Sequence, residues 1–144
     1  MAAKWRRVRI EIPRELGPAA RERIGIELRN RMQERAESGV GVNASGDRSK
    51  RFPGYSDAYA KQKGQTNVDL LVEGDMLAAM NLISHKPGSV LIGFQNGTKE
   101  NGKAEGNIIG SYGKPSGNPA KARNFLGLPP SEIRRIIKEN ADDS

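Results

Sequence analysis

The chain has 144 residues, a length that fits one domain, and carries 24 Lys and Arg against 17 Asp and Glu, for a net charge of +7. It has no run of about 18 apolar residues and no apolar stretch behind Met1, so we expect neither a membrane span nor a secretory signal. The absence of cysteine excludes disulfides, thiolate metal sites and cysteine nucleophiles.

Large apolar side chains are scarce. Leu, Ile, Val and Phe together make up 29 of the 144 residues. When large apolar residues make up so small a fraction of a chain that also carries a high net charge, disorder begins to be favoured over a packed core. We therefore expect a small core with long polar segments that neighbouring molecules complete.

Positive charge is concentrated in the first third of the chain. Residues 1–51 hold 13 basic and 7 acidic side chains, a net charge of +6, whereas the remainder holds 11 and 10, a net charge of +1. A basic end suggests a polyanionic neighbour, such as nucleic acid, an acidic protein surface or an anionic membrane. The alternative is a solvated face that only keeps the protein soluble.

The N-terminal elements have clear periodicities. Apolar β-branched residues alternate with charged ones over residues 5–12, which predicts a half-buried strand that Pro13 ends. Pro18 then suits the first turn of a helix, and Gly39 suits its end. One apolar stripe runs along this helix, formed by Ala20, Ile24, Leu28, Met32 and Ala36.

The middle of the chain is polar and rich in turn-forming residues. A short helical turn is plausible over residues 56–63, with Ser56 as its N-cap. A second short helix is expected over residues 75–81. Its inward-facing residues would be Met76, Leu77 and Met80.

A hairpin is predicted next. Two apolar runs, residues 82–85 and 89–94, flank Pro87 and Gly88, which are turn-forming residues. The second run is apolar throughout, so we expect it to be central in its sheet. A C-terminal helix should start with Ser131 as its cap, and its apolar side would be Ile133, Ile136 and Ile137.

Motifs for catalysis and for ligand binding are weak. His85 is the only histidine and lies beside the predicted turn, so a hydrolase centred on it is a hypothesis held for contrast. Residues 97–103 spell most of a phosphate-binding loop, but Ala104 stands where Ser or Thr would bind Mg²⁺. We predict no catalytic residue, cofactor or metal site.

Trp5 with Arg6, Arg7 and Arg9 resembles an aromatic and basic platform for single-stranded nucleic acid. A tryptophan at the start of a strand is, however, more often a packing residue. A small basic nucleic-acid-binding module is therefore our alternative functional hypothesis.

Three stretches in order carry a family resemblance. They are residues 52–64, residues 69–80 with the strand that ends at Phe94, and residues 119–128, which include Ala-Arg-Asn-Phe-Leu-Gly. Their order resembles the virion morphogenesis, neck and tail-completion proteins of long-tailed double-stranded-DNA bacteriophages. Asn124 stands where the family's late motif has proline.

The resemblance covers roughly residues 52–137 and implies an α+β domain without enzymatic activity. From the length of the chain, we expect residues 1–144 to form that single domain. We expect a long N-terminal helix on a small, mostly antiparallel sheet, with a C-terminal helix and extended loop arms at about residues 40–54 and 95–124. In an isolated chain, those arms should exchange amide hydrogens fast.

The resemblance also implies a location in the neck or tail region of a virion, assembled in the host cytoplasm. The expected partners are copies of this chain in a ring and neighbouring connector or adaptor, tail terminator or tail tube proteins, with possible non-specific contact with packaged DNA. No membrane or small-molecule substrate is implied. Heterologous contacts between identical copies close into rings.

The candidate contact residues fall into two groups. The predicted protein interface comprises Arg123, Phe125, Leu126, Tyr55 and Tyr59. An alternative is that the Phe-Leu pair only anchors the C-terminal helix to the core. The predicted contacts with a DNA channel or an acidic partner are Arg6, Arg7, Arg9, Arg21 and Arg29.

Overall fold

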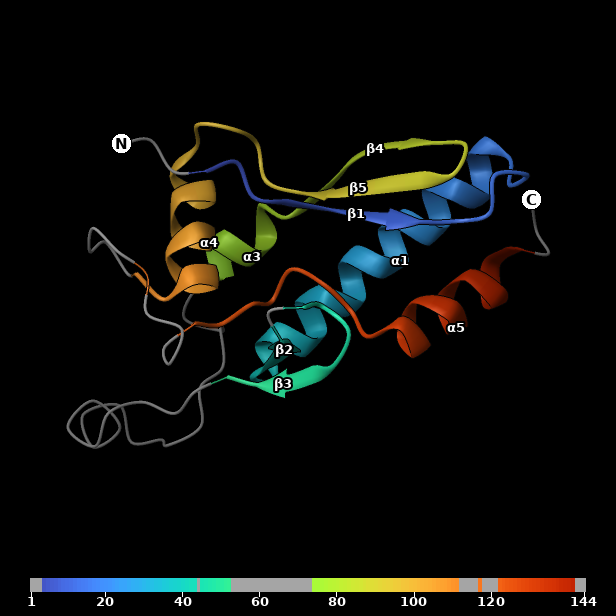
Figure 1. Cartoon of the computed structure of the whole chain (residues 1–144). Coiled ribbons are helices and arrows are strands. Elements are labelled where there is room, and N and C mark those ends of the chain that lie inside the picture. The colour runs from blue at the N-terminus through green and yellow to red at the C-terminus, as the bar shows by residue number, and fades with distance from the viewer. Residues whose placement is uncertain (1–3, 44, 53–73, 112–116, 118–121, 142–144) are drawn as a thin grey trace.

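The computed structural model describes residues 4–43, 45–52, 74–111, 117 and 122–141. These residues form an α+β fold in which a long helix packs across one face of a three-stranded antiparallel sheet (Figure 1). In chain order the elements are β1 (Arg7–Glu11), α1 (Pro18–Glu37), β2 (Val40–Val42), β3 (Ser49–Arg51), α3 (Gly74–Ala78), β4 (Asn81–Lys86), β5 (Ser89–Gly93), α4 (Lys99–Ile109) and α5 (Pro130–Ala141).

The predicted hairpin is confirmed, and its second strand is central. The strand order is β1-β5-β4, with Ile10 of β1 opposite Val90 of β5. Val90 and Ile92 are fully buried, because β5 has a neighbour on each side and α1 below it. The turn between β4 and β5 places Gly88 at φ 95°, a backbone conformation that glycine adopts without strain.

Helix α1 follows its predicted stripe closely. Every residue of the stripe is buried, and the helix ends where Gly39 takes a φ of 83°. Gly25 leaves room for the side chain of Leu82 on β4, because a Cβ built there would be 2.6 Å from a methyl carbon of that leucine. The sequence of α1 therefore specifies both its length and its docking face.

The arm predicted over residues 95–124 contains a helix, so that expectation is wrong for residues 99–109. The hydroxyl of Thr98 accepts the backbone N–H of Asn101 at 3.2 Å and caps α4, while Gly110 ends it in the left-handed conformation. Beside α4 lies α3, whose predicted inward residues Met76, Leu77 and Met80 are all buried.

The arm predicted over residues 40–54 is also partly ordered. Strands β2 and β3 pair in antiparallel fashion, and the side-chain oxygen of Asn43 accepts the backbone N–H of Asp47 at 3.1 Å in the turn between them. Phe52 is buried at the end of this hairpin. A side-chain-bonded turn and one buried aromatic thus give order to a polar segment.

Helix α5 begins one residue earlier than predicted. It starts at Pro130, so Ser131 is inside the helix and is not its cap. The carbonyl of Pro129 accepts the backbone N–H groups of Glu132 and Ile133 instead. The predicted apolar side is confirmed, because Ile136 is buried and Ile133 and Ile137 pack partly against the core.

Two expectations fall on other parts of the chain. The helical turn over residues 56–63 lies outside the described residues, and so do Tyr55 and Tyr59. Among the helices that the structure describes, none has the length and apolar character needed to cross a membrane.

Candidate functional site

Strand β1 lies at an edge of the sheet, and no strand among the described residues pairs with its outer side. The even-numbered residues of β1 form hydrogen bonds with β5. Just beyond the two ends of the strand, the N–H of Ile12 donates to the carbonyl of Gly88, and the carbonyl of Arg6 accepts the N–H of Phe94, both at 3.1 Å. In an antiparallel pair, the intervening residues point their backbone groups the other way. The N–H and C=O groups of Arg7, Arg9 and Glu11 therefore face away from β5, and the described residues provide no partner for them.

A groove of about 460 Å³ runs along this open edge. Val8 and Ile10 line it from β1, and α5 closes it on the far side with Ile133 and Ile137. The segment that precedes α5 forms the floor through Leu126, Gly127 and Leu128. An apolar trough beside unpaired backbone groups is suited to binding an extended polypeptide. We call it the β1 groove.

The late motif lies behind this groove and is mostly buried. Phe125 is 1% exposed and packs edge-on against Phe94, with 6.0 Å between the ring centroids. Leu126 is also buried, at the edge of the β1 groove. The burial of Phe125 fits the alternative, in which this residue anchors the start of α5 to the core. Leu126 packs in the core and also lines the β1 groove, so its predicted interface role stays a prediction.

The two residues that precede Phe125, Arg123 and Asn124, form backbone hydrogen bonds to other parts of the chain. Arg123 is half-buried and donates its backbone N–H to the carbonyl of Asn107 at 2.6 Å. The carbonyl of Asn124 accepts the N–H of Val42 at 2.8 Å, and its side-chain oxygen accepts the N–H of Leu126. The carbonyl of Asn124 thus ties β2 to the segment that lines the β1 groove, and its side-chain amide donates to the carbonyl of Asn43 at 3.5 Å.

Hydrogen bonds and one ion pair hold the N-terminal segment to α4. The side chain of Asn101 accepts the backbone N–H of Arg6 at 2.7 Å and donates to the carbonyl of Lys4 at 3.0 Å. Glu105 accepts the N–H of Lys4 and pairs with the guanidinium of Arg6 at 3.2 Å. Arg6, predicted as a contact for DNA or an acidic partner, is therefore engaged within the chain.

The other predicted basic contacts lie in two different layers. Arg7 and Arg9 are exposed and lie on the face of the sheet opposite the core, because they alternate with Val8 and Ile10. Arg21 and Arg29 are carried by α1, on the core side of that sheet. The structure therefore does not bring these predicted contacts together on one surface, and Arg7 and Arg9 are neighbours on one face of β1.

The side chains of Arg21 and Arg29 are also engaged locally. Arg21 donates to the carbonyl of Leu16 at 2.9 Å and to the Nδ1 atom of His85 at 3.4 Å. Arg29 donates to the side-chain oxygen of Asn30 at 2.6 Å. His85 is thus a half-buried acceptor on β4.

Trp5 is positioned as a packing residue. Its indole N–H donates to the carbonyl of Phe94, and the guanidinium of Arg7 lies 4.0 Å from the centroid of its ring. This cation–π contact covers one face of the indole. That face is consequently occupied, whereas a stacking platform for bases would need it open.

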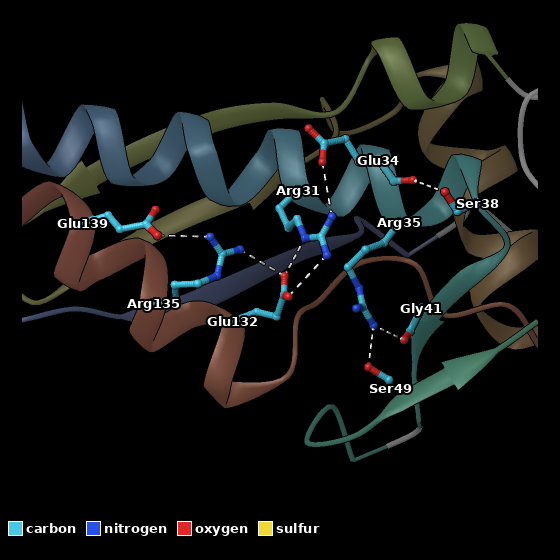
Figure 2. A network of polar contacts seen from close by, with 9 residues as sticks. All are labelled: Arg31, Glu34, Arg35, Ser38, Gly41, Ser49, Glu132, Arg135 and Glu139. Carbon is cyan, nitrogen blue, oxygen red and sulfur yellow. Dashed lines mark hydrogen bonds and ion pairs between the residues drawn. The ribbon is translucent and has the colours of Figure 1, made fainter.

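A charged cluster joins α1 to α5. Figure 2 shows Glu132 between Arg31 and Arg135, with Arg31 bonded to both of its carboxylate oxygens at 2.6 and 3.3 Å. The hydrogen bond from Arg31 is the main reason that the pKa of Glu132 lies below its usual value, and the positive charges of Arg31, Arg135 and Arg35 lower it further. The same bond raises the pKa of Arg31.

Arg35 extends this cluster towards the β2–β3 hairpin. It donates to the carbonyl of Gly41 at 3.1 Å and to the hydroxyl of Ser49 at 2.7 Å (Figure 2). Burial is the main reason that the pKa of Arg35 is lowered. Three separate segments, α1, α5 and the hairpin, are therefore held together by neighbouring arginines of one helix.

The phosphate-loop-like stretch takes a different form. Its Thr98 is the cap of α4, and residues 99–103 form the first turns of that helix. Among the residues that the structure describes, no three or more His, Asp or Glu side chains are grouped to hold a metal ion.

The comparisons of this chain with protein-family models, with curated proteins and with solved structures gave no match.

Proposed function

We propose that this chain is a structural protein of the head–tail junction of a tailed double-stranded-DNA bacteriophage. It acts by assembling with copies of itself into a ring and by binding neighbouring connector or tail proteins, without a chemical step. The observation that carries the proposal is the open edge of β1 beside an apolar groove. Unpaired strand edges bind further polypeptide readily, which suits a protein that works through assembly.

Two further observations support the proposal. The three motifs resembling those of neck and tail-completion proteins occur in order along the chain. The late motif packs as the floor of the β1 groove, with Leu126, Gly127 and Leu128 along it. A motif of that family and the candidate assembly surface are thus adjacent.

The test is electron microscopy of the purified chain and of virus particles that lack it. We expect rings of the chain alone or with its neighbours, and particles whose heads and tails remain separate. A chain that stays monomeric with its neighbours, together with normally joined particles, would overturn the proposal.

A basic nucleic-acid-binding module is the second candidate, because Arg7 and Arg9 are exposed on one face of β1. Binding through phosphate contacts must fall steeply as salt rises. A filter-binding titration with duplex and single-stranded DNA tests this. Arg7→Ala and Arg9→Ala should reduce both the affinity and its salt dependence, and a lack of retention at low salt would exclude the module.

A further inference from the structure

We propose that the β1 groove binds one extended segment of a neighbouring protein, with acidic and apolar residues in alternation, which adds to the sheet as a fourth strand. This inference rests on the proposed function, and it specifies what kind of partner binds to the β1 groove. The backbone supplies the first reason. Arg7, Arg9 and Glu11 present outward N–H and C=O groups in a row, and an added strand satisfies them with its own backbone.

The two faces of the sheet supply the sequence pattern. Side chains of an added strand alternate between the faces. On the core side they would meet Ile133 and Ile137 of α5 and the floor at Leu126, which favours apolar residues such as valine. On the outer side they would lie beside Arg7 and Arg9, which are exposed.

Charge decides what the outer positions hold. Cross-strand pairs of opposite charge stabilise a sheet, and like charges directly opposite destabilise it. Residues next to Arg7 and Arg9 are therefore acidic, whereas the position next to Glu11 is not. Arg134 is also exposed on α5 at the rim of the groove and adds positive charge there.

The shape of the groove favours one strand over a whole sheet edge. In Figure 1, α5 and the segment before it run along the open side of β1, and both line the groove. A second copy that paired its own β1 here would have to bring its attached sheet into that space. A single segment needs only the width of the groove.

The test uses a capped ten-residue peptide in which valine alternates with glutamate. We expect it to bind the full chain and to slow amide exchange at Arg7, Arg9 and Glu11 by about tenfold or more, because each gains a hydrogen-bond partner or is covered. The Arg9→Glu variant should bind about tenfold more weakly. The matched control is Lys138→Glu, an exposed residue of α5 outside the groove, which should bind as the unchanged chain does.

Backbone pairing is tested with two N-methylated peptides, one methylated at every valine and the other at every glutamate. Only one edge of an added strand faces β1, so one set should abolish binding and the other should leave it nearly unchanged. Loss of binding when the glutamates are methylated indicates an antiparallel strand, because residues on the same face as Arg7 and Arg9 then bond to β1. Loss of binding when the valines are methylated indicates a parallel strand. Equal effects of both sets would overturn the proposal.

Three other outcomes would also overturn it. The first is that a peptide of alternating valine and lysine binds as tightly as the valine–glutamate peptide. The second is that the peptide does not protect the β1 amides. The third is that raising the concentration of the chain itself protects those amides, which would assign the groove to a second copy. Rings formed while the β1 amides exchange freely would contradict this inference alone. Peptide binding by a chain that stays monomeric with its neighbours, together with normally joined particles, would contradict the proposed function alone.

Discussion

At the scale of single residues, Asn101 shows how one polar side chain replaces a missing strand partner. Its amide group accepts from the backbone of Arg6 and donates to that of Lys4, as a peptide group in a ladder would, and it is 1% exposed. A buried polar group is stable only when its hydrogen bonds are made. Asn101 therefore extends the order of β1 towards the N-terminus.

The substitution Asn101→Leu should lower the free energy of unfolding by about 2 kcal/mol, because it leaves the N–H of Arg6 and the carbonyl of Lys4 without their partner. Urea unfolding with an unchanged m-value would measure the loss. The control is Asn96→Leu at an exposed position, which should change stability by less than about 0.5 kcal/mol. Equal stability of the two variants would contradict the role given to Asn101.

Two glycines should respond to alanine in opposite directions. Gly102 lies within α4 and has open space where a Cβ would be, so Gly102→Ala should stabilise the protein by about 1 kcal/mol. A Cβ on Gly41 would be 2.1 Å from the carbonyl oxygen of Asn124, so Gly41→Ala should cost at least about 2 kcal/mol. Thermal unfolding of the pair measures both effects, and a destabilising Gly102→Ala would contradict the position of α4.

At the scale of elements, α1 and α5 are joined by Arg31 and Glu132 in addition to their apolar contacts. The arginine holds the carboxylate with two hydrogen bonds, and 20% of the Glu132 side chain is exposed. Glu132→Gln should therefore destabilise the protein by about 1 kcal/mol at neutral pH. Glu139→Gln, which removes a more exposed pair with Arg135, is the control and should cost less than about 0.5 kcal/mol.

The cost of Glu132→Gln should also depend on pH. Because folding lowers the pKa of Glu132, its contribution is complete above the ordinary glutamate pKa of about 4.3 and is lost as pH falls through its lower value in the folded protein. Denaturant unfolding of both proteins from neutral to acidic pH should show their stabilities converging. A constant difference across that range would contradict the ion pair.

Elements with strong periodicity could be predicted from the sequence, and those held by specific contacts could not. Helix α1 and the β4–β5 hairpin follow from an apolar stripe and a Pro-Gly turn. Helix α4 is hard to predict because glycines such as Gly102 and Gly106 interrupt its pattern, although Thr98 is a residue type that commonly caps helices. The β2–β3 hairpin depends on the Asn43 turn and on Asn124, which is far away in the sequence.

The β1 groove could not be predicted for a related reason. The alternation of β1 indicates that one face is buried, but no local pattern tells which strand lies at an edge of a sheet. That position follows from the pairing of β5 with both β1 and β4. Likewise, the burial of Phe125 depends on Phe94, which lies on a different part of the chain.

At the scale of the whole molecule, hydrogen exchange should separate the two sides of β1. Amides of Val8 and Ile10, bonded to β5, should exchange slowly in the isolated chain, and those of Arg7 and Arg9 should exchange fast. In the segments expected to be loop arms, residues 102–109 should show protection, because their amides donate to carbonyls within α4 or to that of its cap residue, Thr98. Uniform exchange along β1, measured by nuclear magnetic resonance, would contradict the open edge.

The distance along the chain between paired segments has a consequence for biosynthesis. Ile10 pairs with Val90, and Arg31 meets Glu132 only after 101 further residues have been added. Contacts so remote in sequence form late and slowly. During translation, the basic N-terminal third therefore leaves the ribosome before the segments that it pairs with have been made. Chaperone binding or premature self-association would act on the chain at this stage.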